Sequence, residues 1–131
     1  MSIIKHTPLF IFIFILYNVV VIAGDGTLTS VLVRVPLLSR TDWPFTTSDL
    51  LLALSLIALY GELVKATSSS NASILDHSFS VLVFVAFLVE FIAYRPAGTS
   101  TFFLMTLMSF VDVVAGFTVT IAASRRDFGH N

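Results

Sequence analysis

The chain has 131 residues, of which 56% are hydrophobic and 11% are charged, and its formal net charge is −1 at pH 7. Soluble domains carry about 25% charged residues, so this composition excludes an ordinary soluble domain and predicts an integral membrane protein. The near-neutral charge and the lack of a basic stripe exclude nucleic acid as a partner. The chain has no cysteine, which excludes disulfides, thiolate nucleophiles and zinc–thiolate sites.

The first apolar run predicts a helix over residues 8–24. Pro8 suits the first helical turn, and the run after it is long and lacks polar alternation. A positive start, an apolar centre and the small residues Ala23 and Gly24 are also typical of a secretory signal peptide. We therefore predict a first transmembrane helix, with a cleaved signal as the alternative.

We predict that residues 25–47 form an interfacial connector between the first two helices. The segment is too short and too interrupted to span a membrane, since Pro36 stops any long helix. Trp43, Pro44 and Phe45 form an aromatic group of the kind found at the level of lipid headgroups. We expect either an extended segment at the interface or a strand-like hairpin arm, and a recognition loop for a partner is the alternative.

The second helix is predicted over residues 48–66. Threonine and serine side chains before it can cap its first turn, where Asp49 also interacts favourably with the helix dipole. Glu62 and Lys65 are three residues apart, so their side chains lie on one face within reach of each other. Because they lie near the end of the helix, we predict an interfacial ion pair.

The third helix is predicted over residues 73–94 and carries charges near both of its ends. Asp76 and His77 fall in its first turns, and we expect both at the membrane surface. Glu90 lies about one turn before the end, where the side chain of Arg95 can reach back toward it or toward the C-terminal carbonyls of the helix. The short link that follows predicts an antiparallel hairpin with the next helix.

The fourth helix, over residues 100–124, is the most unusual element, because it is long enough to cross a bilayer yet carries Asp112 at its centre. An ionised aspartate there costs about 2.5–3.5 kcal/mol on insertion scales. Small and polar residues at helical spacing share its face and predict a helix-packing seam, namely Ser109, Gly116 and Thr120. We interpret Asp112 as a buried, hydrogen-bonded member of this seam, and a proton- or ion-handling carboxylate is the alternative.

The predicted fold class is an all-α membrane protein, an antiparallel bundle of four transmembrane helices in one domain. Both termini then lie on one side, and the Arg125–Arg126 pair favours the cytoplasm. Antiparallel threading places Tyr17, Asn18 and Ser55 at the depth of Asp112. We predict that these side chains are its hydrogen-bond donors and that the four residues form an intramembrane polar site.

The chain lacks the GxSxG, HExxH, P-loop and GxGxxG motifs, so we predict no enzymatic activity and no cofactor. The chain resembles small four-helix bacterial inner-membrane proteins of unassigned function. The resemblance lies in three stretches, residues 47–66, 74–80 and 110–128. This resemblance carries no functional residues. We predict a structural or accessory component that contacts lipid and packs against itself or other membrane subunits. The alternative is an oligomeric small transporter or channel that uses Asp112.

Overall fold

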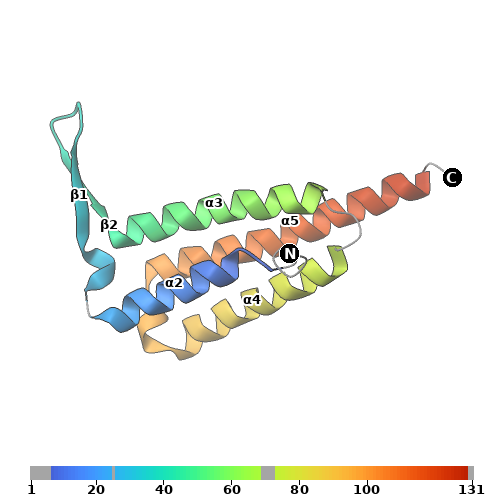
Figure 1. Ribbon diagram of the computed structural model, residues 1–131, viewed down its shortest axis with the longest axis horizontal. Helices are drawn as coiled ribbons and strands as arrows, with labels where there is room; N and C mark the ends of the chain where they lie inside the picture. The colour runs from blue at the N-terminus through green and yellow to red at the C-terminus, as the bar shows by residue number, and fades with distance from the viewer. Residues whose placement is uncertain (1–6, 25, 69–72, 130–131) are drawn as a thin grey trace.

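The computed structural model describes residues 7–24, 26–68 and 73–129. Most of them lie in four α-helices, which are α2 (Phe10–Ala23), α3 (Thr47–Ser68), α4 (Ser73–Ala93) and α5 (Ser100–Gly129). Successive helices alternate in direction, so the start of α2 and the end of α5 point toward the same end of the bundle (Figure 1). The predicted order of four antiparallel helices is confirmed; α4 and α5 begin at the predicted residues, and the other boundaries are shifted by one to five residues.

The connector between α2 and α3 contains a β-hairpin, which corrects the prediction of an all-α chain with an interfacial loop. A short 3₁₀ turn (η1, Thr27–Thr29) leads into β1 (Val31–Pro36), which pairs with β2 (Asp42–Thr46). The strands are antiparallel, and a register shift between Val31 and Val33 forms a bulge. β-branched and aromatic residues favour strands, and the prolines exclude a helix here. The strand-like arm was therefore the correct alternative.

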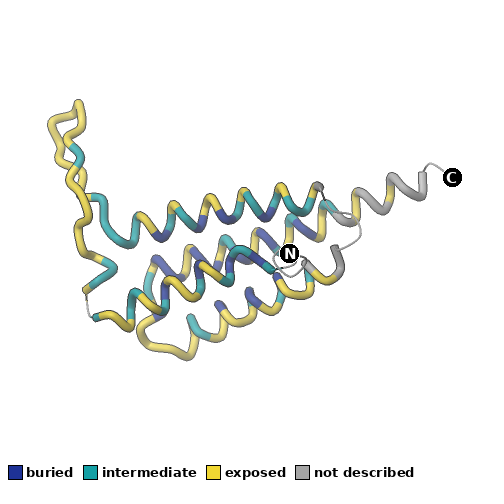
Figure 2. Tube along the Cα trace, viewed as in Figure 1, coloured by how far each residue is buried: buried dark blue, intermediate teal, exposed yellow. Residues whose placement is uncertain are grey.

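The hairpin stands across the axis of the bundle and extends past the side of α3 (Figure 1). Its turn is closed by the Leu37 amide, which donates to the Thr41 carbonyl at 2.9 Å, while Arg40 adopts a left-handed φ of 68°. Figure 2 shows that most of the arm is exposed, and Leu38 at its tip is completely so. The hairpin is thus joined to the bundle mainly where β2 runs into α3.

Side-chain caps define the starts of α3 and α5. Thr46 and Asp49 form a reciprocal pair, in which the Thr46 amide donates to Asp49 and the Asp49 amide donates to Thr46 Oγ1. Thr99 Oγ1 accepts a hydrogen bond from the Phe102 amide at 3.1 Å. These contacts satisfy backbone donors that the first turn of a helix leaves without intrahelical partners.

The core of the bundle is built on an aromatic cluster, which we define as Phe10, Phe14, Tyr17, Phe87, Phe91 and Phe102. Phe102 on α5 is fully buried at its centre, with its ring centroid 4.7 Å from that of Tyr17 and 5.3 Å from that of Phe87. It thereby joins α5 to both α2 and α4. Leu51, Val83 and Met105 extend the same core.

The helices differ in length, and two of them are long and apolar enough to cross a membrane, α3 over Thr47–Thr67 and α5 over Ser100–Val119. The apolar parts of α2 and α4 are shorter. A 3₁₀ turn (η2, Arg95–Ala97) joins α4 to α5. Because α5 is about 45 Å long at ~1.5 Å per residue, its C-terminal end extends beyond the other three helices (Figure 1).

Candidate functional site

Asp112 lies in a buried polar group at the end of the bundle where α2 begins. Its side chain is only 6% exposed, and the Ser80 hydroxyl on α4 hydrogen-bonds to it. Glu62 and Lys65 on α3 are close enough to interact electrostatically with the Asp112 carboxyl. We call these four residues the Asp112 cluster. Three helices therefore contribute side chains to one polar site.

Glu62 and Lys65 form the predicted ion pair, with Nζ 3.5 Å from Oε1. The pair is not a solvated surface contact, because the Glu62 side chain is only 6% exposed. Glu62 Oε1 also accepts a hydrogen bond from the Leu9 amide, and Lys65 Nζ donates to the Thr7 carbonyl at 3.0 Å. The pair thus attaches the start of α2 to the end of α3.

The predicted packing seam brings α4 against α5. A Cβ atom added to Gly116 would lie 2.5 Å from His77 Cε1, so the imidazole occupies the space that a side chain would need. The same ring stacks on Phe117 with centroids 5.1 Å apart. Ser109, one turn before Asp112, is also fully buried. His77 is therefore part of the contact between α4 and α5.

Two of the predicted residues cannot be placed in these sites. The side chains of Thr120, expected in the seam, and Asp76, expected at the surface, lie outside the described residues. The backbone of both residues is helical.

A second polar group lies at the opposite end of the bundle, near the hairpin. The fully buried Tyr17 hydroxyl donates to the Pro96 carbonyl at 3.0 Å and lies 2.7 Å from Thr99 Oγ1. The neighbouring Asn18 amide donates to Glu90 Oε2 at 3.1 Å. These contacts attach the end of α2 to the connection between α4 and α5.

Arg95 is exposed and does not form the expected contact with Glu90. Among the described residues, Arg95 forms no ion pair. The Glu90 carboxylate instead accepts a hydrogen bond from the side-chain amide of Asn18. Arg95 instead belongs to the η2 turn, where its carbonyl accepts a hydrogen bond from the Gly98 amide.

The structure does not bring Asp112 together with its three predicted donors. Tyr17 and Asn18 contact the opposite end of the bundle, and Ser55 Oγ donates to the Leu51 carbonyl of its own helix. The prediction assumed that all four helices share one midplane. Because α5 extends beyond the others, the centre of α5 lies level with the start of α2 and the end of α3. Asp112 consequently meets Ser80, a residue that the sequence analysis missed.

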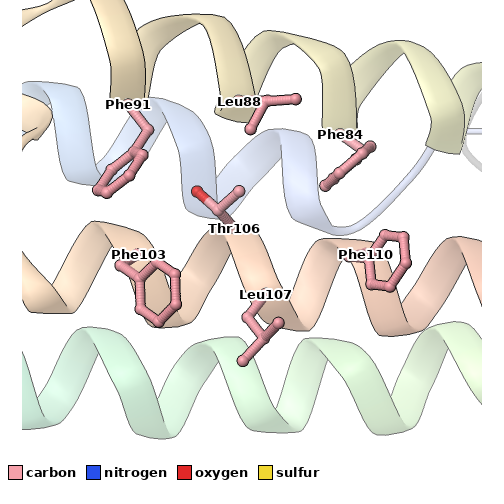
Figure 3. Close-up of a pocket in the computed structure, with 7 residues that line it drawn as sticks. All are labelled: Phe84, Leu88, Phe91, Phe103, Thr106, Leu107 and Phe110. Atoms are coloured by element: carbon pink, nitrogen blue, oxygen red, sulfur yellow. The ribbon is translucent and has the colours of Figure 1, made fainter.

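An apolar hollow of about 190 Å³ lies on the surface between α4 and α5 (Figure 3). Two aromatic pairs line it, Phe84 with Phe110 and Phe91 with Phe103. Its single polar lining residue, Thr106, donates its hydroxyl to the Phe102 carbonyl at 2.8 Å. The hollow can accept an apolar side chain or acyl chain.

The described residues contain no group of three or more His, Asp or Glu side chains placed to hold a metal ion. The chemistry of the two polar groups is hydrogen bonding and ion pairing between helices. Comparison with protein families, with curated proteins and with solved structures found no match to this chain.

Proposed function

We propose that this chain is an integral membrane protein with a structural or accessory role, packing against itself or against the subunits of a larger membrane complex. The observation that carries the proposal is the distribution of charge on the helices. Between the ends of the four helices, every charged side chain in the described ranges 10–23, 47–67, 77–93 and 100–119 is buried or half-buried.

The outer surface of the same helices is apolar. Each helix exposes large hydrophobic side chains, among them Phe12, Ile15, Val19, Leu56, Ile57, Tyr60, Leu82, Val89, Ile92, Phe103, Phe110 and Ile121. An exposed apolar surface of this extent is unfavourable in water and suits contact with lipid or with other transmembrane helices. Charged side chains turned away from an apolar outer surface are the arrangement expected of helices in a bilayer.

The interior supports an accessory role more than a transport role. All buried side-chain nitrogen and oxygen atoms in the described part of the chain have hydrogen-bond partners. The aromatic cluster separates the Asp112 cluster from the polar group around Tyr17. A conducting path needs polar groups or water along its length, whereas the centre of this bundle is packed with aromatic rings.

The membrane assignment predicts that the two ends of α3 lie on opposite sides of a bilayer. Ser39 lies in the exposed turn of the hairpin, and Thr67 is exposed at the other end of α3. Because the chain has no cysteine, Ser39→Cys and Thr67→Cys each provide a single reactive thiol. With cytoplasmic termini in a bacterial inner membrane, we expect an impermeant maleimide to label Ser39→Cys in intact spheroplasts and to label Thr67→Cys only after lysis.

Labelling of both thiols in intact spheroplasts would contradict a transmembrane α3, as would release of the protein by alkaline carbonate. Labelling of Thr67→Cys alone would reverse the orientation and leave the transmembrane assignment intact. Ser39→Ala and Thr67→Ala serve as unlabelled controls.

A proton- or ion-translocating role is the second candidate, because two buried carboxylates, Glu62 and Asp112, lie near each other in the Asp112 cluster. Asp112→Asn retains the hydrogen-bonding shape of the side chain and removes its titration. Under the accessory proposal we expect this variant to elute in the same assembly as the wild type after mild-detergent purification. Mass spectrometry should identify the same components in both.

The same pair of proteins separates the two candidates in sealed vesicles. We expect wild type and Asp112→Asn to give equal proton flux, read with an internal pH-sensitive dye under an imposed potential. A wild-type flux well above that of empty vesicles, abolished by Asp112→Asn, would replace the accessory proposal with the transport alternative.

A further inference from the structure

One face of the β-hairpin is apolar and is not covered by the bundle. Val33 pairs with Phe45 and Val35 pairs with Trp43 across the two strands. Directly paired residues share a face of a sheet, as do residues two apart along a strand. The rings of Trp43 and Phe45 are 5.5 Å apart, in agreement with this placement. We call these four residues the hairpin face.

The other side of the hairpin carries the charged side chains of the two strands. Arg34 pairs with Pro44, and Pro36 pairs with Asp42, so both charged side chains point away from the hairpin face. Val33 and Trp43 are exposed, at 51% and 43%. The arm is therefore amphipathic, with aromatic and aliphatic side chains on one side and charges on the other.

The hairpin receives little support from the bundle. An isolated two-stranded hairpin is at best marginally stable in water, and this one is joined to the bundle mainly at the start of α3. It lies across the helix axis and extends past the side of α3 (Figure 1). When the helices span a bilayer, an arm in this position runs parallel to the bilayer surface, above the lipids next to α3.

The charge at this end of the bundle fits lipid headgroups. Arg40 in the hairpin turn and Arg95 in η2 are both exposed. Among the residues that the structure describes, neither forms an ion pair. Guanidinium groups bind phosphate through paired hydrogen bonds, and tryptophan is enriched at the headgroup level.

We infer that the hairpin face lies on the bilayer, with Trp43 and Phe45 at the boundary between headgroups and acyl chains and with Arg40 and Arg95 at the lipid phosphates. The inference rests on the proposed membrane role. It adds a surface anchor of two strands to the four helices, and it names the bilayer surface as the partner of that anchor.

Trp43 is the only tryptophan in the chain, so its fluorescence reports on the hairpin face without any substitution. The experiment uses the full chain in vesicles of phosphatidylcholine with a minority of phosphatidylglycerol. We expect blue-shifted emission, weak quenching by aqueous iodide, and strong quenching by lipids brominated at the headgroup end of their acyl chains. Lipids brominated at the chain terminus should quench less.

A matched set of variants tests the orientation of the arm. Val33→Thr with Val35→Thr retains strand propensity and makes the hairpin face more polar, so iodide quenching of Trp43 should rise roughly twofold. Arg34→Thr, on the opposite face of the same strand, should leave the quenching unchanged. Equal effects of the two changes would overturn the assignment of this face to the lipid.

Two other results would overturn the inference. Trp43 quenched by iodide as strongly as a free tryptophan analogue would place the arm in water. Trp43 shielded from iodide but unquenched by every brominated lipid would place protein over the hairpin face, from a second copy or another subunit. Vesicle flotation separates these failures from failure of the membrane role, because a chain that does not float with the vesicles contradicts that role itself.

Discussion

Replacement of Phe102 by alanine should lower the free energy of unfolding by about 3 kcal/mol, as expected for removal of a fully buried phenylalanine. The Phe102 ring has no exposed surface and contacts rings of Phe14, Tyr17, Phe87 and Phe91. In the proposed membrane setting lipid is as apolar as the core, so the loss would reflect packing more than transfer from water. The cavity would remove the ring contacts that join α5 to both α2 and α4.

Phe103 provides the matched control, since it is adjacent in sequence, is 48% exposed, and contacts the ring of Phe91. We expect Phe103→Ala to change stability by less than about 1 kcal/mol. Both variants can be compared by unfolding in mixed micelles of a mild detergent and dodecyl sulfate, followed by circular dichroism. Equal destabilisation by the two substitutions would contradict the central position of Phe102.

Replacement of Lys65 by methionine should destabilise the protein by about 2 kcal/mol, below the 3–5 kcal/mol typical of a fully buried pair, because Lys65 is 28% exposed. Methionine retains the length of the side chain and removes the charge. The buried Glu62 carboxylate then loses its cation, and the Thr7 carbonyl loses a donor. The start of α2 should become more accessible to hydrogen exchange.

The cause can be separated from simple loss of packing by neutralising the partner as well. Glu62→Gln combined with Lys65→Met leaves no buried charge from this pair, so the double variant should regain part of the stability lost in Lys65→Met. Lys65→Arg, which retains the charge, should stay close to the wild type. Strictly additive losses in the double variant would show that the two side chains act independently.

The two polar groups and the aromatic cluster between them have a consequence for the proposed role. Tyr17 with Thr99 joins the helices at one end, and Glu62 with Lys65 joins them at the other. The bundle is thus held at both ends, packed with rings between them, and apolar on its exterior. Such a unit suits a component that other membrane subunits assemble against.

The helices, their order and two of their caps were predictable from the sequence, because these features depend on local patterns. Long apolar runs need helical hydrogen bonding in a membrane. Thr46 and Thr99 precede such runs, as capping residues do, and their side-chain oxygens accept hydrogen bonds from the Asp49 and Phe102 amides. The spacing of Glu62 and Lys65 predicted their ion pair, because residues three apart are neighbours on any helix.

The partners of Asp112 were decided only by the tertiary structure. The sequence shows that Asp112 is central in its own helix, but the depth at which one helix meets another depends on how far each extends past its neighbours. α5 extends beyond the bundle, so Asp112 contacts Ser80 in place of Tyr17, Asn18 or Ser55. The hairpin was one of two possibilities for this connector, because the same residues also fit a single extended segment at the interface, and the pairing of β1 with β2 decided between them.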